Sequence, residues 1–270
     1  MIPNVLTIAG TDPTGGAGIQ ADLKAFSAHR AHGMSVITAV VAQNTQGVRG
    51  FVPLEPAFVA DQITAVFDDV RVDAVKIGMV ANAAIAETVA HALDQQARCP
   101  IVLDPVMIAK SGDHLLSPDA VAAIRDELVP RATLITPNLP EASVLLGLQD
   151  EIADVEEMRA HLDALRALGA DWVLLKGGHL RDDECLDVLT GETTTELTAP
   201  RIATTNDHGT GCTLSAAIAA LLPSHDAVTS VRLAKAYLTE ALRRADELDV
   251  GSGHGPVHHF YSLWTTREQQ

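Results

Sequence analysis

The stretch NVLTIAGTDPTGGAGIQADLKAFSAHRAHGMSVITAVVA, residues 4–42, contains the pattern that decides the fold. It opens with an apolar run at 4–9 that is typical of a β-strand, and residues 16–31 follow with the apolar periodicity of a helix. A second apolar run, SVITAVVA at 35–42, predicts another buried strand. A strand, a helix and a strand in this order predict a unit whose two strands run parallel.

The alternation continues along the rest of the chain. Short β-branched runs predict further strands at 74–77, 101–103, 134–136 and 172–175. Longer Ala- and Leu-rich runs predict helices at 56–70, 83–98, 117–128, 154–168, 211–222 and 227–248. Residues 184–203 predict short strands with turns. This order is typical of an α/β fold with a mostly parallel central sheet and helices on both faces.

Length and composition favour one domain. The chain has 270 residues, 47% of them hydrophobic, and no visible linker, so 1–270 is predicted to form a single domain. The net charge of −16 disfavours nucleic acid as a partner. It also means that a polyanionic ligand needs a local positive pocket, with a metal ion to help, unless the acidity serves only solubility.

The cysteines and the apolar segments limit other classes of protein. Cys99, Cys185 and Cys212 lie far apart, so neither a disulfide framework nor a zinc site is indicated. His254, His258 and His259 fit no compact set of metal ligands. Because the sequence has no basic leader and no apolar stretch of membrane-spanning length, we expect a cytoplasmic protein that does not bind membranes.

Polar and glycine-rich clusters follow several of the predicted strands. In such folds ligands bind beyond the carboxyl ends of the strands, which meet at one edge of the sheet. The clusters are the loop 10–18, Gln43-Asn44, Gly78-Met79, Asp104, Asn138 and the segment 176–178. The sequence therefore predicts one ligand site along that edge.

The segment His208-Gly209-Thr210-Gly211-Cys212 precedes a predicted helix. Glycines leave backbone N–H groups unobstructed, and a helix N-terminus favours negative charge, so Gly209, Thr210 and Gly211 are candidates for binding a phosphoryl group. Cys212 in the first turn is expected to have a lowered pKa and to act as a base. A plain glycine-rich turn with a small cysteine fits the same residues.

Acidic and basic residues at the predicted edge could handle phosphate. Asp104, Asn138 and Glu141 could hold Mg²⁺ directly or through water, since Mg²⁺ prefers oxygen ligands. Asn138 and Glu141 would equally suit a capped helix start. Lys176 could bind phosphate or pair with a surface acid.

Two features could bind a flat heterocycle. The amide of Gln43 complements an aminopyrimidine edge, although a buried glutamine bonded to backbone fits as well. The loop 10–18 is neither a Walker A motif nor a G-x-G-x-x-G fingerprint. Its small residues would let the backbone approach a ligand, or would simply make a tight turn.

Taken together, these segments resemble the hydroxymethylpyrimidine/phosphomethylpyrimidine kinases, and the resemblance runs nearly end to end. It rests on TIAGTDPTGGAGIQADLK (7–24), SVITAVVAQNTQGV (35–48), VKIGMV (75–80), VLDPVMIAKSGDHLLS (102–117), LITPNLPEASVLL (134–146), LLKGGH (174–179), HGTGCTLSAAIAAL (208–221) and GPVHHF (255–260). The resemblance implies a ribokinase-like fold. It also implies phosphorylation of 4-amino-5-hydroxymethyl-2-methylpyrimidine by ATP with Mg²⁺, first to the monophosphate and then to the diphosphate.

The resemblance also assigns roles to residues. It implies that Gln43 binds the aminopyrimidine in a pocket shaped by Gly10, Ala17, Asp22, Val41, Met79 and Val106. It places Asp104, Asn138 and Glu141 in the magnesium and phosphate region, Lys176 facing phosphate, and the amides of 209–212 in an anion hole. Most ribokinase-like sugar kinases have an aspartate at the position of Cys212, whereas the pyrimidine kinases have cysteine.

Two other functions remain open from the sequence. The first is a pyridoxine or pyridoxal kinase, or a kinase that accepts both rings, because pyridoxal is similar in size and also bears a hydroxymethyl group. The second is a non-catalytic pyrimidine-binding protein, against which Asp104, Glu141 and Lys176 argue. The resemblance further implies a homodimer.

Overall fold

A computed structural model describes residues 1–107, 116–178, 180 and 184–264, and the rest of the motifs at 102–117 and 174–179 lies outside them. The main sheet has eight strands. In spatial order they are β10 (Thr194–Pro200), β9 (Glu184–Thr190), β8 (Trp172–Lys176), β7 (Leu134–Ile135), β6 (Ile101–Leu103), β5 (Ala74–Ile77), β1 (Asn4–Ala9) and β2 (His32–Ile37).

Strand direction confirms the predicted mostly parallel sheet. The strands from β2 to β8 in this order pair in parallel, whereas β9, in the β9–β10 hairpin added at one edge, pairs antiparallel with both β8 and β10. The parallel strands are short apolar runs such as Ala74–Ile77, all of it buried, as expected for strands covered on both faces. Their carboxyl ends share one edge of the sheet.

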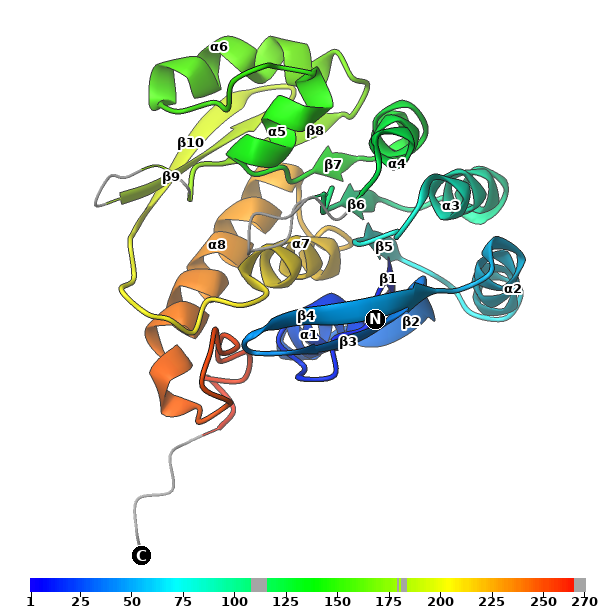
Figure 1. Ribbon diagram of the computed structural model, residues 1–270, viewed down its shortest axis with the longest axis horizontal. Helices are drawn as coiled ribbons and strands as arrows, with labels where there is room; N and C mark the ends of the chain where they lie inside the picture. Colours follow the sequence, from blue (N-terminus) through cyan, green and yellow to red (C-terminus); the bar gives the residue numbers. More distant parts are fainter. Residues whose placement is uncertain (108–115, 179, 181–183, 265–270) are drawn as a thin grey trace, which may run out of the picture.

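Helices cover both faces of the sheet, as predicted, and Figure 1 shows the two layers. One face carries α1 (Gly18–Ala28), α7 (Thr210–Leu221) and α8 (Ala227–Arg243), which pack on one another. The other carries α2 (Pro56–Phe67), α3 (Ala83–Gln96), α4 (Pro118–Ala123), α5 (Leu139–Leu146) and α6 (Val155–Arg166). Each layer has its own buried apolar cluster, so the sheet lies between two cores.

The single strand predicted at 35–42 is only partly present, because residues 35–37 end β2 and the chain leaves the main sheet at Thr38. Thr38 is fully buried, its N–H donates to the Ala9 carbonyl, and its hydroxyl donates to the Met79 carbonyl. Beyond it, β3 (Ala39–Asn44) and β4 (Gly47–Pro53) form a separate antiparallel hairpin. The apolar run misled the prediction because Val40, in its middle, is exposed rather than buried.

Most predicted helices are present with ends that differ by a few residues. The helix predicted at 117–128 consists of α4 followed by a π-helical turn, Ile124–Leu128. α8 ends at Arg243, short of the predicted 248. Asp154 caps α6 by accepting from the Glu157 N–H, as its capping-box pattern predicts. Among the described residues, no helix is both long and apolar enough to cross a bilayer.

Candidate active site

Three residues predicted to shape the substrate pocket lie together near the end of β1. A Cβ at Gly10 would lie 3.3 Å from the sulfur of Met79 and 3.7 Å from a methyl group of Val41. Val41 also donates its N–H to the hydroxyl of Thr11, which follows Gly10. The first loop, the hairpin and the segment after β5 therefore meet here, and a side chain at position 10 would crowd the space between them.

Gln43 lies on the hairpin rather than at an end of the main sheet. A β-bulge falls between Ala42 and Gln43, and bulges re-aim the side chains next to them. The Gln43 side chain lies near the carboxylate of Asp12, which is fully buried in the first loop, and helps to lower the pKa of that carboxylate. A glutamine amide has one acceptor and two donors, so Gln43 can also engage other partners.

The first loop and the segment 209–212 touch through their backbones. Gly209 has φ +76°, in the left-handed region that favours glycine. A Cβ at Gly209 would overlap the Gly16 carbonyl oxygen and lie 3.1 Å from the Cα of Ala17. α7 begins at the next residue, so its first amides have no acceptor within the helix and face this junction with the positive end of the dipole.

Lys176, Asp104 and Gly211 form a second cluster. The Lys176 Nζ lies 3.3 Å from Asp104 Oδ1. A Cβ at Gly211 would lie 3.3 Å from that Nζ and 3.5 Å from Asp104 Oδ2. Burial alone would lower the pKa of Lys176, but Asp104 and Glu141 hold it above its usual value, so the ammonium stays charged. A positive group therefore lies directly beside the N-terminus of α7.

Asp104 is almost fully buried and is held by several donors. Thr136 donates to its Oδ1 at 3.1 Å, and Ser215 of α7 approaches its Oδ2 at 3.3 Å. Burial would raise the pKa of Asp104, but Lys176 and Lys76 lower it below its usual range. The carboxylate is therefore ionised, and Ser215 ties it to the helix that carries Cys212.

Asn138 and Glu141 cap α5. The Asn138 side chain accepts from the Glu141 N–H at 2.8 Å, and Glu141 Oε2 accepts from the Asn138 N–H at 2.9 Å. The capped helix start, which the sequence left open, is thus present, and Asn138 Oδ1 is already engaged. Glu141 is buried, and burial raises its pKa to about 7 against the opposing effect of Lys176, with Asp104 raising it further.

The donor set fits Mg²⁺ only in part. Among the described residues, no group of three or more His, Cys, Asp and Glu side chains is placed to hold a metal ion. Two buried carboxylates, Asp104 and Glu141, nevertheless repel each other when both are ionised, and Lys176 interacts electrostatically with both. A divalent cation that keeps most of its water would relieve that repulsion. The residues therefore fit a water-mediated site better than direct coordination by all three predicted ligands.

The expected low pKa of Cys212 is wrong. The residue is partly exposed, and its thiol accepts a hydrogen bond from the Gly18 N–H at the start of α1. Burial raises the pKa of Cys212 to about 11, although Lys76 opposes the shift. Asp22 and Asp104 raise it further. The helix dipole is outweighed mainly because burial disfavours a thiolate, with the nearby carboxylates adding to the effect.

Asp22 forms a buried ion pair, and its place in the substrate pocket stays a prediction. It is fully buried, and both of its oxygens lie 2.9 Å from the Nζ of Lys76, also fully buried, while Thr7 donates to it at 2.6 Å. Direct ligand contact by Asp22 would break this pair. Sequence reasoning missed Lys76, although a lysine inside the apolar strand AVKI was the signal. Asp22 holds the pKa of Lys76 above its usual value, so a buried cation lies near Cys212.

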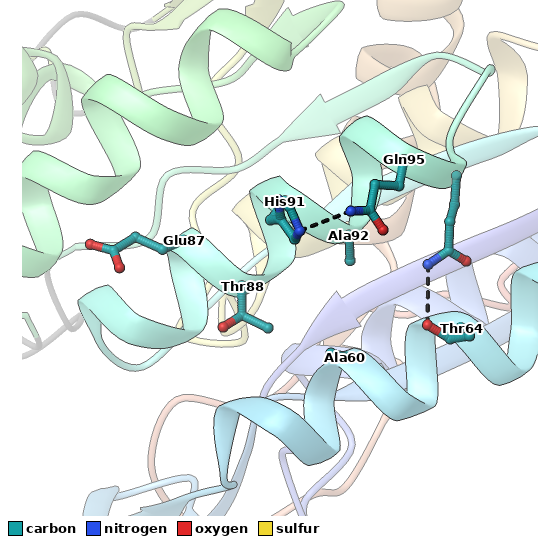
Figure 2. A pocket seen from close by; sticks show the side chains of 8 residues that line it. Ala60, Thr64, Glu87, Thr88, His91, Ala92 and Gln95 are labelled. Atoms are coloured by element: carbon teal, nitrogen blue, oxygen red, sulfur yellow. Dashed lines mark hydrogen bonds between the residues drawn. The ribbon is translucent and has the colours of Figure 1, made fainter.

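Two further observations complete the survey of the site. Val106 is half-buried and follows Asp104, to whose carbonyl its N–H donates, and its place in the pocket stays a prediction. A separate cavity of about 350 Å³ opens between α2 and α3 and is drawn in Figure 2. None of the predicted site residues lines it, so this cavity is not the candidate active site.

Comparison with known proteins places this fold among the ribokinase-like small-molecule kinases. The pyridoxal kinase from Staphylococcus aureus, solved in complex with AMP-PCP and pyridoxal, superposes with a TM-score of 0.88. It is 32% identical, over 97% of this chain and 96% of that chain. The phosphomethylpyrimidine kinase family matches residues 12–258. The chain therefore belongs to the phosphomethylpyrimidine kinase family.

Two curated relatives are named for pyrimidine phosphorylation or thiamine biosynthesis. The hydroxymethylpyrimidine/phosphomethylpyrimidine kinase of Escherichia coli (strain K12) is 56% identical over 97% of this chain and 98% of its own length. The thiamine biosynthesis bifunctional protein ThiED of Geobacter sulfurreducens is 46% identical over 98% of this chain and 54% of its own length. The predicted family and fold are thus confirmed, and the chain is a phosphotransferase of this family.

Proposed function

We propose that this protein phosphorylates 4-amino-5-hydroxymethyl-2-methylpyrimidine with ATP, first to the monophosphate and then to the diphosphate, in thiamine biosynthesis. The observation that carries the proposal is the backbone contact of Gly209 with Gly16. This contact brings together two clusters of residues. The uncharged cluster around Gly10 suits a flat ring, and the cluster around the Lys176 ammonium suits phosphate. Membership of the family and the names of the relatives support the same activity.

The residues of the first cluster bind and orient the acceptor. Gln43 offers an amide oxygen to the ring amine and an N–H to a ring nitrogen, and its side chain lies near Asp12. Gly10, Val41 and Met79 line the pocket for the pyrimidine ring, and Ala17 and Val106 complete it. In this arrangement the hydroxymethyl oxygen lies near Cys212, in line with the γ-phosphate of ATP.

The second cluster stabilises the transferring phosphoryl group. The amides of 209–212 face its oxygens, and Lys176 offsets their charge. Asp104 and Glu141, with Asn138 beside them, would hold Mg²⁺ through water, and Mg²⁺ when bound supplies charge neutralisation at the phosphates. Since Cys212 is protonated at neutral pH, its thiol positions the hydroxyl, and the proton leaves late in the transfer.

The second phosphorylation uses the same groups. The phosphate already on the pyrimidine becomes the nucleophile, so the junction must accept additional negative charge. Lys76 is neutralised by Asp22, so the ammonium of Lys176 and the amides at the N-terminus of α7 must supply the positive potential for this step.

A pyridoxal kinase is the second candidate, because the S. aureus neighbour is a pyridoxal kinase whose structure holds AMP-PCP and pyridoxal. The test is ADP release with ATP and Mg²⁺, measured on the pyrimidine, its monophosphate and pyridoxal. We expect turnover of both pyrimidines to exceed that of pyridoxal, and Gln43→Ala to reduce it, with Gln46→Ala of the same hairpin as control. Faster turnover of pyridoxal would assign the second function, and binding without ADP release would indicate a non-catalytic protein.

We also propose a homodimer in the cytoplasm, where ATP is available, with the whole chain acting as one kinase domain. The outer face of the hairpin supports the dimer, since Val40 and Val52 pair across its strands and are 51% and 66% exposed. Light scattering should find a dimer that Val40→Asp dissociates and that Leu233→Asp, on the exposed side of α8, does not. A monomeric wild type would contradict the dimer.

A further inference from the structure

The carboxylate of Asp12 organises the first loop. It is fully buried and accepts hydrogen bonds along the whole loop. Thr14 donates to Oδ1 through its N–H at 2.9 Å and through its hydroxyl at 2.8 Å. Gly16 and Ala17 donate their N–H groups to Oδ2 at 3.0 and 2.8 Å. Asp12 therefore sets the shape of the loop that lies against the acceptor.

One further donor to Asp12 comes from a distant part of the chain. The Nε2 of His208 lies 2.9 Å from Asp12 Oδ2. Because the lowered pKa of Asp12 keeps its carboxylate ionised, it can only accept, and His208 must present Nε2–H to it. Asp12 thus contacts the acceptor loop, the hairpin residue Gln43 and the segment before α7 at the same time.

His208 is itself fixed at its backbone. Its N–H donates to the Gly255 carbonyl at 3.0 Å, and it forms an isolated bridge with Pro256. The next residue is Gly209, where an added Cβ would overlap the Gly16 carbonyl oxygen. Because the His208 backbone is held in this way, the contact of its ring with Asp12 connects the first loop to the amides that follow His208.

We propose that Asp12 and His208 form a positioning pair that holds the acceptor loop in register with the anion-binding amides at the start of α7. This inference rests on the proposed function, since it assigns the two loops to acceptor and phosphoryl group. The pair contacts neither reacting atom. It matters for turnover because transfer depends on the relative placement of two ligands, and each ligand alone binds to only one side of the junction.

The test compares variants that keep or remove the Nε2 donor. His208→Gln can place an amide N–H near the position of Nε2, whereas His208→Leu cannot donate. His208→Asn is a second variant in case leucine prevents folding, since its amide is too short to reach Oδ2. His254→Leu is the matched control, because His254 forms a similar 2.9 Å pair with Asp207, the residue before His208, but is exposed.

We expect His208→Leu and His208→Asn to lower kcat about 10- to 100-fold, the range for losing a hydrogen bond to a buried charged group. KM for each substrate and the affinity for ADP alone should change by no more than about threefold. His208→Gln and His254→Leu should keep kcat within about threefold of wild type. Amide exchange should speed up at both 14–18 and 209–213 in the leucine and asparagine variants only.

Two results would overturn the pairing. The first is unchanged kcat and unchanged exchange in His208→Leu or His208→Asn. The second is an equal loss in His254→Leu, which would indicate general destabilisation. Failure of the proposed function is separate, since it would appear as wild-type enzyme that releases no ADP with any acceptor. The exchange measurement still decides the pairing in that case.

Discussion

Gly209→Ala tests whether the contact between the two loops is required for phosphoryl transfer. At φ +76° an alanine costs about 1–2 kcal/mol in backbone strain alone. Its Cβ would also overlap the Gly16 carbonyl oxygen, so the loops must separate. Because a displacement of about 1 Å at a reacting centre can cost about 100-fold in rate, we expect kcat to fall by about that factor or more.

Gly147→Ala separates the effect of the contact from the effect of strain. Gly147 ends α5 with φ +67°, so alanine carries a similar backbone cost there, but no atom lies within 4 Å of its Cβ. Urea unfolding should find both variants destabilised by about 1–2 kcal/mol or more, while ADP release stays near wild type only in Gly147→Ala. Equal turnover of the two variants would refute the argument that the loops must touch.

Three further predictions concern buried groups. Cys212→Ser should keep turnover within about tenfold, since the thiol's pKa of about 11 leaves it protonated at neutral pH, and a much larger loss would restore a role as base. Lys76→Met should lower the unfolding free energy by about 3–5 kcal/mol because it leaves the Asp22 carboxylate unpaired, and urea titration showing little change would contradict this. Burial lowers the pKa of His29 from 6.5 to about 4, so His29 takes up a proton at higher pH in the unfolded chain than in the folded protein. The free energy of unfolding should therefore fall by up to about 3 kcal/mol as the pH drops from 6.5 towards 4. His29→Phe should remove that slope in unfolding measured across this range, since His29 Nε2 is buried without a hydrogen-bond partner, and an unchanged slope would assign it to other groups.

The sheet and its layers could be predicted because parallel strands buried on both faces leave a simple apolar signal. The β3–β4 hairpin could not be predicted, because the apolar run 35–42 has the same sequence pattern whether Val40 is buried or, as here, exposed. Its departure from the sheet depends on Thr38, which bonds to Ala9 and Met79 from other strands. Such contacts between distant residues have no local pattern.

The candidate site was predictable where a residue's type limits its chemistry. Glycines at 10, 209 and 211 could be singled out, and the structure places each of them against another predicted site residue or the first loop. The pKa of Cys212 was not predictable, because it depends on Asp22 and Asp104, which are remote in sequence. The contact between His208 and Asp12 was missed for the same reason, since each lies in a segment that the sequence singled out but only the fold pairs them.

The backbone contact between Gly16 and Gly209 also has a consequence for biosynthesis of the enzyme. The two loops come from opposite ends of the chain, so closing them is a late and entropically costly event in folding. A nascent chain still on the ribosome has no complete nucleotide site until α7 has emerged. Retention on an immobilised nucleotide should therefore select full-length molecules and reject truncated ones.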